Sequence, residues 1–234
     1  MAFLLIIIVV LLGVLAMFWQ RQQKLKREAY IRSFVLPSGL FAKLQRKHPQ
    51  LSLKDCQLVA RGLRKYFLTH LKSRHGEVAM PSQVVDDLWH EFILYTKAYQ
   101  SFCEQAFGKF FHHTPAAVLK SSAQSNAGLR RCWWYACLDE NINPKHPLRL
   151  PLLFALDDKL KIKDGFVYAA NCEAFKMDPE KRADGAVVYC GGDFSNTSVD
   201  GSTDGFGDAA TSSASDGGDG GGGDGGGGCG GGGD

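Results

Sequence analysis

An unbroken apolar run, AFLLIIIVVLLGVLAMFW, occupies residues 2–19 and contains no charged side chain and no proline. As a helix that rises 1.5 Å per residue, the run reaches roughly 27 Å, close to the ~30 Å hydrocarbon core of a bilayer. Trp19 closes the run where an interfacial aromatic side chain is expected. The sequence therefore predicts a single-pass transmembrane anchor at residues 1–20.

Basic side chains follow the apolar run at once, at Arg21, Lys24, Lys26, Arg27 and Arg32. By the positive-inside rule they place the amino terminus outside and the following domain in the cytoplasm. A cleavable signal peptide is the alternative, but it carries its charge before the apolar run and small residues at the cut. Here the charge comes after the run, so we favour an uncleaved anchor. The basic cluster also suits anionic headgroups, although setting the topology is enough to explain it.

The other end of the chain has a different composition. Residues 191–234 hold 19 Gly and 8 Asp with no Lys or Arg, whereas residues 1–190 hold 27 basic and 16 acidic side chains. A Gly/Asp-rich segment of this kind cannot bury enough apolar surface to fold, so we predict a disordered acidic tail at residues 191–234. Its Cys229 would be exposed. Because the charges of the basic body and the acidic tail largely cancel, the net charge of the whole chain is only +3.

Seven cysteines are scattered through the chain without a CxxC spacing. An odd number without a framework pattern argues against a disulfide-stapled secreted domain and favours reduced thiols in the cytoplasm.

Between the anchor and the tail, helical periodicity predicts a mainly α-helical domain. Residues 21–51 form a basic juxtamembrane segment and the first helices, on both sides of Pro37, and residues 52–190 form the helical domain proper. Ser52 and Asp55 predict a capping box at the start of a helix that Gly76 would end.

The central helix is predicted to run from Pro81 to Phe107, with Ser82 as its cap and Gly108 as its end. At 100° per residue its apolar side chains fill one broad arc, which builds the core and includes Cys103. Leu94 and Ala98 interrupt the polar side and suggest partial cover by another element.

His90 lies on that polar side, four residues after Asp86 and three after Asp87. Either carboxylate could meet the imidazole and orient a metal-binding or basic histidine. An ordinary surface ion pair explains the same spacing, and it is the interpretation we favour.

A third ligand from His112 or His113 faces a geometric obstacle. His90 to Phe107 spans roughly 25 Å of straight helix, whereas the chain from Phe107 to His112 can return at most about 17 Å. A divalent metal site that joins them therefore requires a break in the helix or a ligand from elsewhere.

The block DDLWHEFILYTKAYQSFCEQAFGKFFHHTP, which begins at Asp86, resembles the glycine-rich domain-containing protein family of plants and short bacterial members. The matching positions are Asp87, Leu88, Trp89, His90, Thr96, Tyr99, Cys103, Phe107, Gly108, His113 and Pro115. The resemblance implies family membership without an assigned reaction. Plant members are discussed as regulatory or RNA-associated proteins, but they carry further domains that this chain lacks.

The carboxyl half predicts a helix over residues 126–140, a short helix over 152–160 and two strands, 166–170 and 186–189, as a small hairpin. Arg130 and Arg131 beside Trp134 could contact nucleic acid, but two arginines make a thin patch.

We therefore expect a membrane-tethered interaction or scaffold module with a protein partner and no established cofactor. A metal-binding protein or metal-dependent enzyme built on His90 with Asp86 or Asp87 is the first alternative. RNA binding through the basic body, which would weaken steeply with salt, is the second, and we regard a nucleic-acid partner as the weaker expectation. No small-molecule substrate follows from the sequence.

Overall fold

The computed structural model describes residues 2–74, 76–113, 123–170 and 188–190. The predicted acidic tail, with Cys229, and Pro115 of the family-like block lie outside these residues. The described elements are mainly helical, as predicted. Their order is α1 (Ala2–Ser33), α2 (Leu40–Lys47), α3 (Leu53–Lys72), α4 (Gln83–Ile93), α5 (Thr96–Phe107), α7 (Ala123–Asp139), α8 (Leu152–Lys159), β1 (Val167–Ala169) and β2 (Val188–Cys190).

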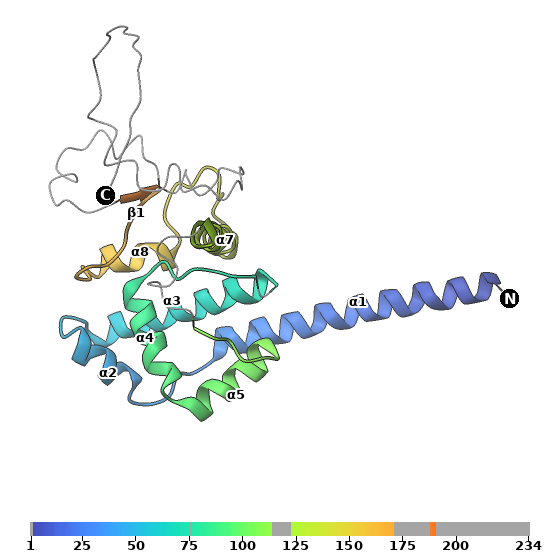
Figure 1. The fold of residues 1–234 in the computed structure, drawn as a ribbon, viewed down its shortest axis with the longest axis horizontal. Coiled ribbons are helices and arrows are strands. Elements are labelled where there is room, and N and C mark those ends of the chain that lie inside the picture. The colour runs from blue at the N-terminus through green and yellow to red at the C-terminus, as the bar shows by residue number, and fades with distance from the viewer. Residues whose placement is uncertain (1, 75, 114–122, 171–187, 191–234) are drawn as a thin grey trace, which may run out of the picture.

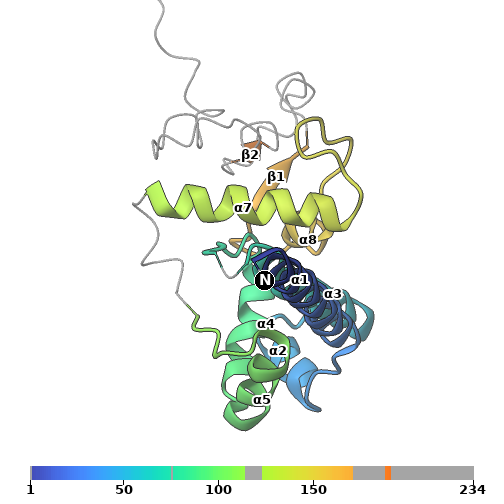
Figure 2. The ribbon, with the colours of Figure 1, turned by 90° about the vertical axis from the view of Figure 1, so that its right-hand side faces the viewer.

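Helix α3 is the centre of the core. It packs against α1, α2, α4, α7 and α8, and its side chains Leu63, Phe67 and Leu68 are almost fully buried. Figures 1 and 2 show α7 and α8 on one side of α3 and α5 on the other, with α4 running between. Burial on both sides explains why apolar residues surround most of this helix.

Helix α1 projects from the domain (Figure 1). Among the described residues, one helix, Phe3–Ser33, is long and apolar enough to cross a membrane. Its apolar side chains up to Trp19 are exposed. The helix continues without interruption past residue 20, and its last turns join the domain core, where Ile31 is fully buried.

The predicted single helix from Pro81 to Phe107 is wrong in one respect: the structure has two helices. Helix α4 ends at Ile93 and α5 starts at Thr96, with Tyr95 between them in a non-helical conformation (φ −83°, ψ 61°). The break turns both helices onto one core, since the ring of Phe92 lies 5.2 Å from that of Tyr99 and 5.6 Å from that of Phe102. Leu94, expected to be covered, sits at the break and is exposed.

Local end signals account for three of the helix boundaries. Ser52 and Asp55 form the predicted capping box, and Ser82 accepts a hydrogen bond from the amide of Val85. Gly108 ends α5 with φ +75°, in the left-handed region. Gly76 does not end α3, which stops earlier, at Lys72.

The two short strands pair in parallel, Val167 opposite Val188, and not as the predicted hairpin. A hairpin joins its strands by a tight turn, whereas eighteen residues separate β1 from β2 here, enough for a crossover. The predicted helix over residues 126–140 corresponds to α7, whose side chains Cys132, Trp133, Ala136 and Cys137 are buried.

Candidate metal centre

Three potential metal ligands meet beside α4, at Asp86, His90 and His113. One ligand atom from each lies within 4.8 Å of the others. Asp86 Oδ1 is 2.8 Å from His113 Nε2, and Asp86 Oδ2 is 3.6 Å from His90 Nδ1. Asp86 and His90 share one face of α4 because they are four residues apart, whereas His113 comes from the segment after α5.

The break between α4 and α5 makes this meeting possible. Along a straight helix His113 could not return to His90, but after the break α5 no longer extends the axis of α4 (Figure 1). The imidazole rings of His90 and His113 now have centroids 4.3 Å apart. The condition that the sequence set for a joint site is met.

Hydrogen bonds hold the return segment, residues 108–113, against the two helices. The Tyr99 hydroxyl donates to the Phe111 carbonyl over 2.6 Å and accepts from the Trp89 indole N–H over 3.1 Å. Burial holds the pKa of Tyr99 well above its ordinary value, so the hydroxyl keeps the proton that it donates. The Cys103 thiol, whose pKa burial also raises, lies against the backbone of Phe111 and the Tyr99 side chain.

Aromatic packing fixes the end of the return segment. The Phe111 ring stacks on His70 at 3.7 Å and on Trp89 at 5.0 Å. His113 sets its ring edge-on to Trp89 at 4.4 Å. Its side chain is 9% exposed, against 47% for His90. The cluster therefore has one sheltered and one accessible imidazole, and it opens to solvent on the His90 side.

Asp87, predicted as an alternative partner of His90, is not part of the cluster. It is buried and faces the other way, where it accepts hydrogen bonds from Lys47 (2.5 Å), His48 (2.7 Å) and Gln83 (3.1 Å). Burial opposes ionisation of Asp87, but these hydrogen bonds and the Lys47 charge prevail and lower its pKa. Asp87 joins α2 to α4 and serves the fold.

The other predicted site residues are not ligands of the cluster: some lie outside it, and others support its structure. His112 lies outside the cluster: it is exposed, and its ring sits 4.8 Å from that of Phe110. Gly108 starts the return segment with a positive φ of 75°, a conformation that glycine adopts readily. The Arg27 guanidinium lies against Gly108. Arg21, Lys24 and Lys26 are exposed on α1.

The donor set suits a divalent transition metal. Imidazole and carboxylate are ligands of Zn²⁺ at about 2.0–2.2 Å, which in a tetrahedron places ligand atoms roughly 3.3–3.6 Å apart. Asp86 meets His90 through Oδ2 (3.6 Å) and His113 through Oδ1 (2.8 Å), and with one ligand atom from each residue the three atoms lie within 4.8 Å of one another. Side-chain shifts of about an ångström would therefore bring the three ligand atoms to tetrahedral spacing. Sequence spacing alone made Asp86 and Asp87 equally good candidates for the carboxylate partner of His90. It gave no sign that the Phe111 carbonyl anchors the segment that carries His113.

A family model described as UCP032817-like matches residues 26–194, more than half of the chain. No curated protein and no solved structure matches the chain. The resemblance to glycine-rich domain-containing proteins is untouched by these comparisons and stays a prediction. The match spans the end of α1, the whole cluster and the α7–α8 layer, and the chain accordingly belongs to the UCP032817-like family.

Proposed function

We propose that this protein is a membrane-anchored, metal-binding protein whose helical domain holds a divalent transition metal at Asp86, His90 and His113. The convergence of these three ligand atoms within 4.8 Å carries the proposal. A surface ion pair, favoured from spacing alone, needs one carboxylate and one histidine. It leaves unexplained the second imidazole, which arrives from a separate, hydrogen-bonded segment.

Three protein ligands leave a coordination position free. Structural zinc sites usually close with four protein ligands, whereas catalytic ones keep three and bind water or substrate in the fourth. Zn²⁺ bound in this way lowers the pKa of its water to about 7. The exposed flank at His90 gives an exchangeable ligand access, so the arrangement suits a metal-dependent enzyme or a sensor.

Elemental analysis of the full chain, purified in detergent and loaded with Zn²⁺, tests the proposal. We expect about one equivalent of metal in the natural protein and a clear loss in His90→Ala, His113→Ala and Asp86→Asn. His112→Ala is the matched control, because it removes the neighbouring exposed histidine and should leave the metal in place. Equal metal content in all variants, or none in the folded natural protein, would overturn the proposal.

The anchor and its orientation form the second part of the proposal. The length and exposure of the apolar run in α1 support a membrane span. The basic residues Arg21, Lys24, Lys26 and Arg27 favour an outside amino terminus and a cytoplasmic domain. Protease digestion of intact cells should remove an amino-terminal tag and spare a carboxyl-terminal one, and the mass of the purified chain should exclude cleavage after the run.

The interaction or scaffold role and RNA binding stay predictions. One of the two arginines behind the RNA hypothesis has a structural task, since Arg131 donates to the Glu77 carbonyl. A metal site has the more specific support, and we place it first.

A further inference from the structure

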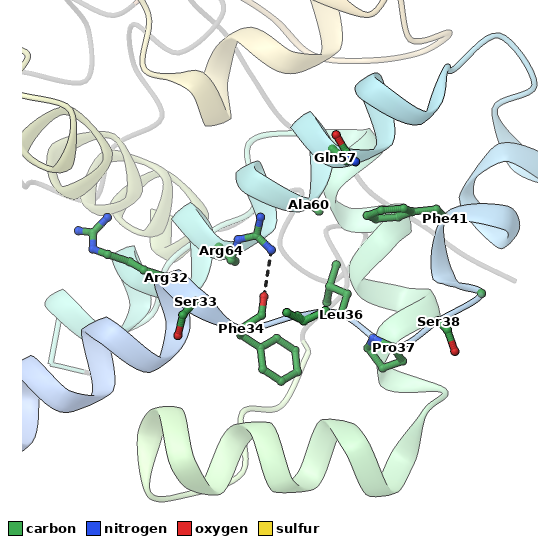
Figure 3. A pocket seen from close by; sticks show the side chains of 12 residues that line it. Arg32, Ser33, Phe34, Leu36, Pro37, Ser38, Phe41, Gln57, Ala60 and Arg64 are labelled. Atoms are coloured by element: carbon green, nitrogen blue, oxygen red, sulfur yellow. Dashed lines mark hydrogen bonds between the residues drawn. The ribbon is translucent and has the colours of Figure 1, made fainter.

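A pocket of about 350 Å³ lies where the end of α1 joins the domain (Figure 3). The linker between α1 and α2 forms one wall, the start of α2 another, and α3 the third. Pockets for small ligands begin at about this size. The metal cluster contributes no residue to it.

The walls are mostly apolar and carry no acid. The apolar lining residues are Phe34, Val35, Leu36, Pro37, Phe41 and Ala60. The polar contributions come from Ser33, Ser38, Gln57, Arg32 and Arg64, and none of the described lining residues is acidic.

Arg64 is the distinctive group of this pocket. It reaches from α3 toward the linker, where its Nη1 donates to the Phe34 carbonyl over 3.1 Å (Figure 3). Its side chain is partly buried and, among the described residues, forms no ion pair with a carboxylate. Arg32 differs, because its guanidinium is paired with Asp139.

A partly buried guanidinium without a counter-ion is costly, and burial together with the neighbouring Arg61 lowers the pKa of Arg64. A ligand carboxylate would supply the missing charge and match the fork of the guanidinium with two parallel hydrogen bonds. Gln57 at the rim offers one further donor. Inorganic phosphate fits less well, because Arg32 is already paired with Asp139, which leaves Arg64, with the serine hydroxyls and the Gln57 amide, as the donors for its four oxygens.

We propose that this pocket binds a small organic carboxylate with an apolar body, its carboxylate held by Arg64 and its body by Leu36 and Phe41. The Phe34 ring does not take part, because it packs against Phe92 and Phe102 of the core. The ligand would enter from water and not from a bilayer. The apolar run ends at Trp19, roughly 20 Å of helix before Arg32. Bound there, the ligand would bridge the linker and α3.

Calorimetric titration of the full chain in detergent tests the proposal, with 4-phenylbutyrate as the probe and ligand-into-micelle heats subtracted. We expect saturable, one-to-one binding of 4-phenylbutyrate and weaker binding of acetate, inorganic phosphate and the neutral 4-phenylbutanamide. Arg64→Gln should weaken binding at least roughly tenfold, because a charge-assisted hydrogen bond is lost. Arg61→Gln removes the same charge from an exposed neighbour outside the pocket and should keep most of the affinity.

Val35→Asp provides a second variant that does not depend on Arg64, since Val35 lines the pocket and is 83% exposed. A carboxylate at this position should compete for Arg64 and weaken binding, whereas Val35→Asn should not. The proposal is overturned if the folded natural protein gives no saturable heat with 4-phenylbutyrate. It is equally overturned if Arg64→Gln binds like the natural protein, or if acetate, phosphate or the amide binds as tightly.

Discussion

Nε2 of His113 lies 2.8 Å from Oδ1 of Asp86 although the two residues are 27 positions apart in the chain. The contact depends on the helix break at Tyr95, on the left-handed turn at Gly108 and on the anchored Phe111 carbonyl. The candidate metal centre is thus a product of tertiary structure, so metal binding and folding should be linked.

Zinc should raise the stability of the domain through that linkage. A ligand that binds only the folded state at 100 times its Kd stabilises it by about 2.7 kcal/mol. We expect the thermal midpoint of the full chain in detergent to rise with Zn²⁺ and to return after chelation. His113→Ala should show no rise, and His112→Ala should behave like the natural protein.

Tyr99→Phe should destabilise the domain by about 1–3 kcal/mol, because the Phe111 carbonyl and the Trp89 indole N–H lose their shared partner. Zinc affinity should fall as well, since His113 is two residues from Phe111. Tyr95→Phe is the control: its hydroxyl makes one long, exposed contact with the Ser38 carbonyl, 3.4 Å. Equal effects of the two variants in chemical unfolding and zinc titration would argue against a positioning role for Tyr99.

Asp157→Ala should cost about 2 kcal/mol or more, because the buried Asp157 carboxylate of α8 caps the start of α4. It accepts from the Ser82 hydroxyl (2.7 Å) and from the amides of Gln83 (2.6 Å) and Val84 (3.2 Å). Asp158→Ala removes the exposed neighbour, whose ion pair with Lys161 is worth little. Urea unfolding of the two variants should differ accordingly, and matching midpoints would contradict the capping role.

Gly108→Ala should destabilise the domain by about 1–2 kcal/mol, since an alanine at φ +75° is strained. The added methyl would also lie 2.5 Å from Nη2 of Arg27, which must move away. Gly13→Ala, with open space around it, should leave the thermal midpoint unchanged.

Acid should weaken the domain partly through Asp139. Burial acts to raise the pKa of this carboxyl, but hydrogen bonds from Arg32, Lys65 and Lys72 lower it well below its ordinary value. The unfolded chain therefore takes up the proton first, so this contribution is complete above pH ~5 and is lost progressively as the pH falls further. Asp139→Asn should cost about 1.5–3 kcal/mol at pH 7 and show a flatter decline between pH 5 and 3. Parallel declines in urea unfolding would exclude Asp139 as a source.

Helix starts and ends could be predicted because their causes are local. Ser52 with Asp55, Ser82 and Gly108 each satisfy backbone groups within a few residues, and the structure uses all of them as expected. The break at Tyr95 left no such sign. It has no glycine, proline or capping side chain, and the apolar arc continues in phase beyond it, so core packing of Phe92 against Tyr99 and Phe102 decides it.

The candidate site could be predicted only in part, because part of it depends on local spacing and part on tertiary packing. Spacing placed His90 near both Asp86 and Asp87, but only the position of α2, with Lys47 and His48, assigns Asp87 to the fold and leaves Asp86 for His113. The hairpin failed similarly, since the direction of strand pairing depends on the path of the connecting chain.

Helix α1 passes from its exposed apolar half to the buried Ile31 as one continuous rod of 32 residues, roughly 48 Å long. A flexible tether would let the domain reorient independently of the apolar segment. This rod instead works as a lever arm, clamped at its inner end by the Arg32–Asp139 pair and the Arg27–Gly108 contact. We therefore expect a tilt or rotation imposed on the apolar end to be transmitted to the domain, and with it to the direction in which His90 faces.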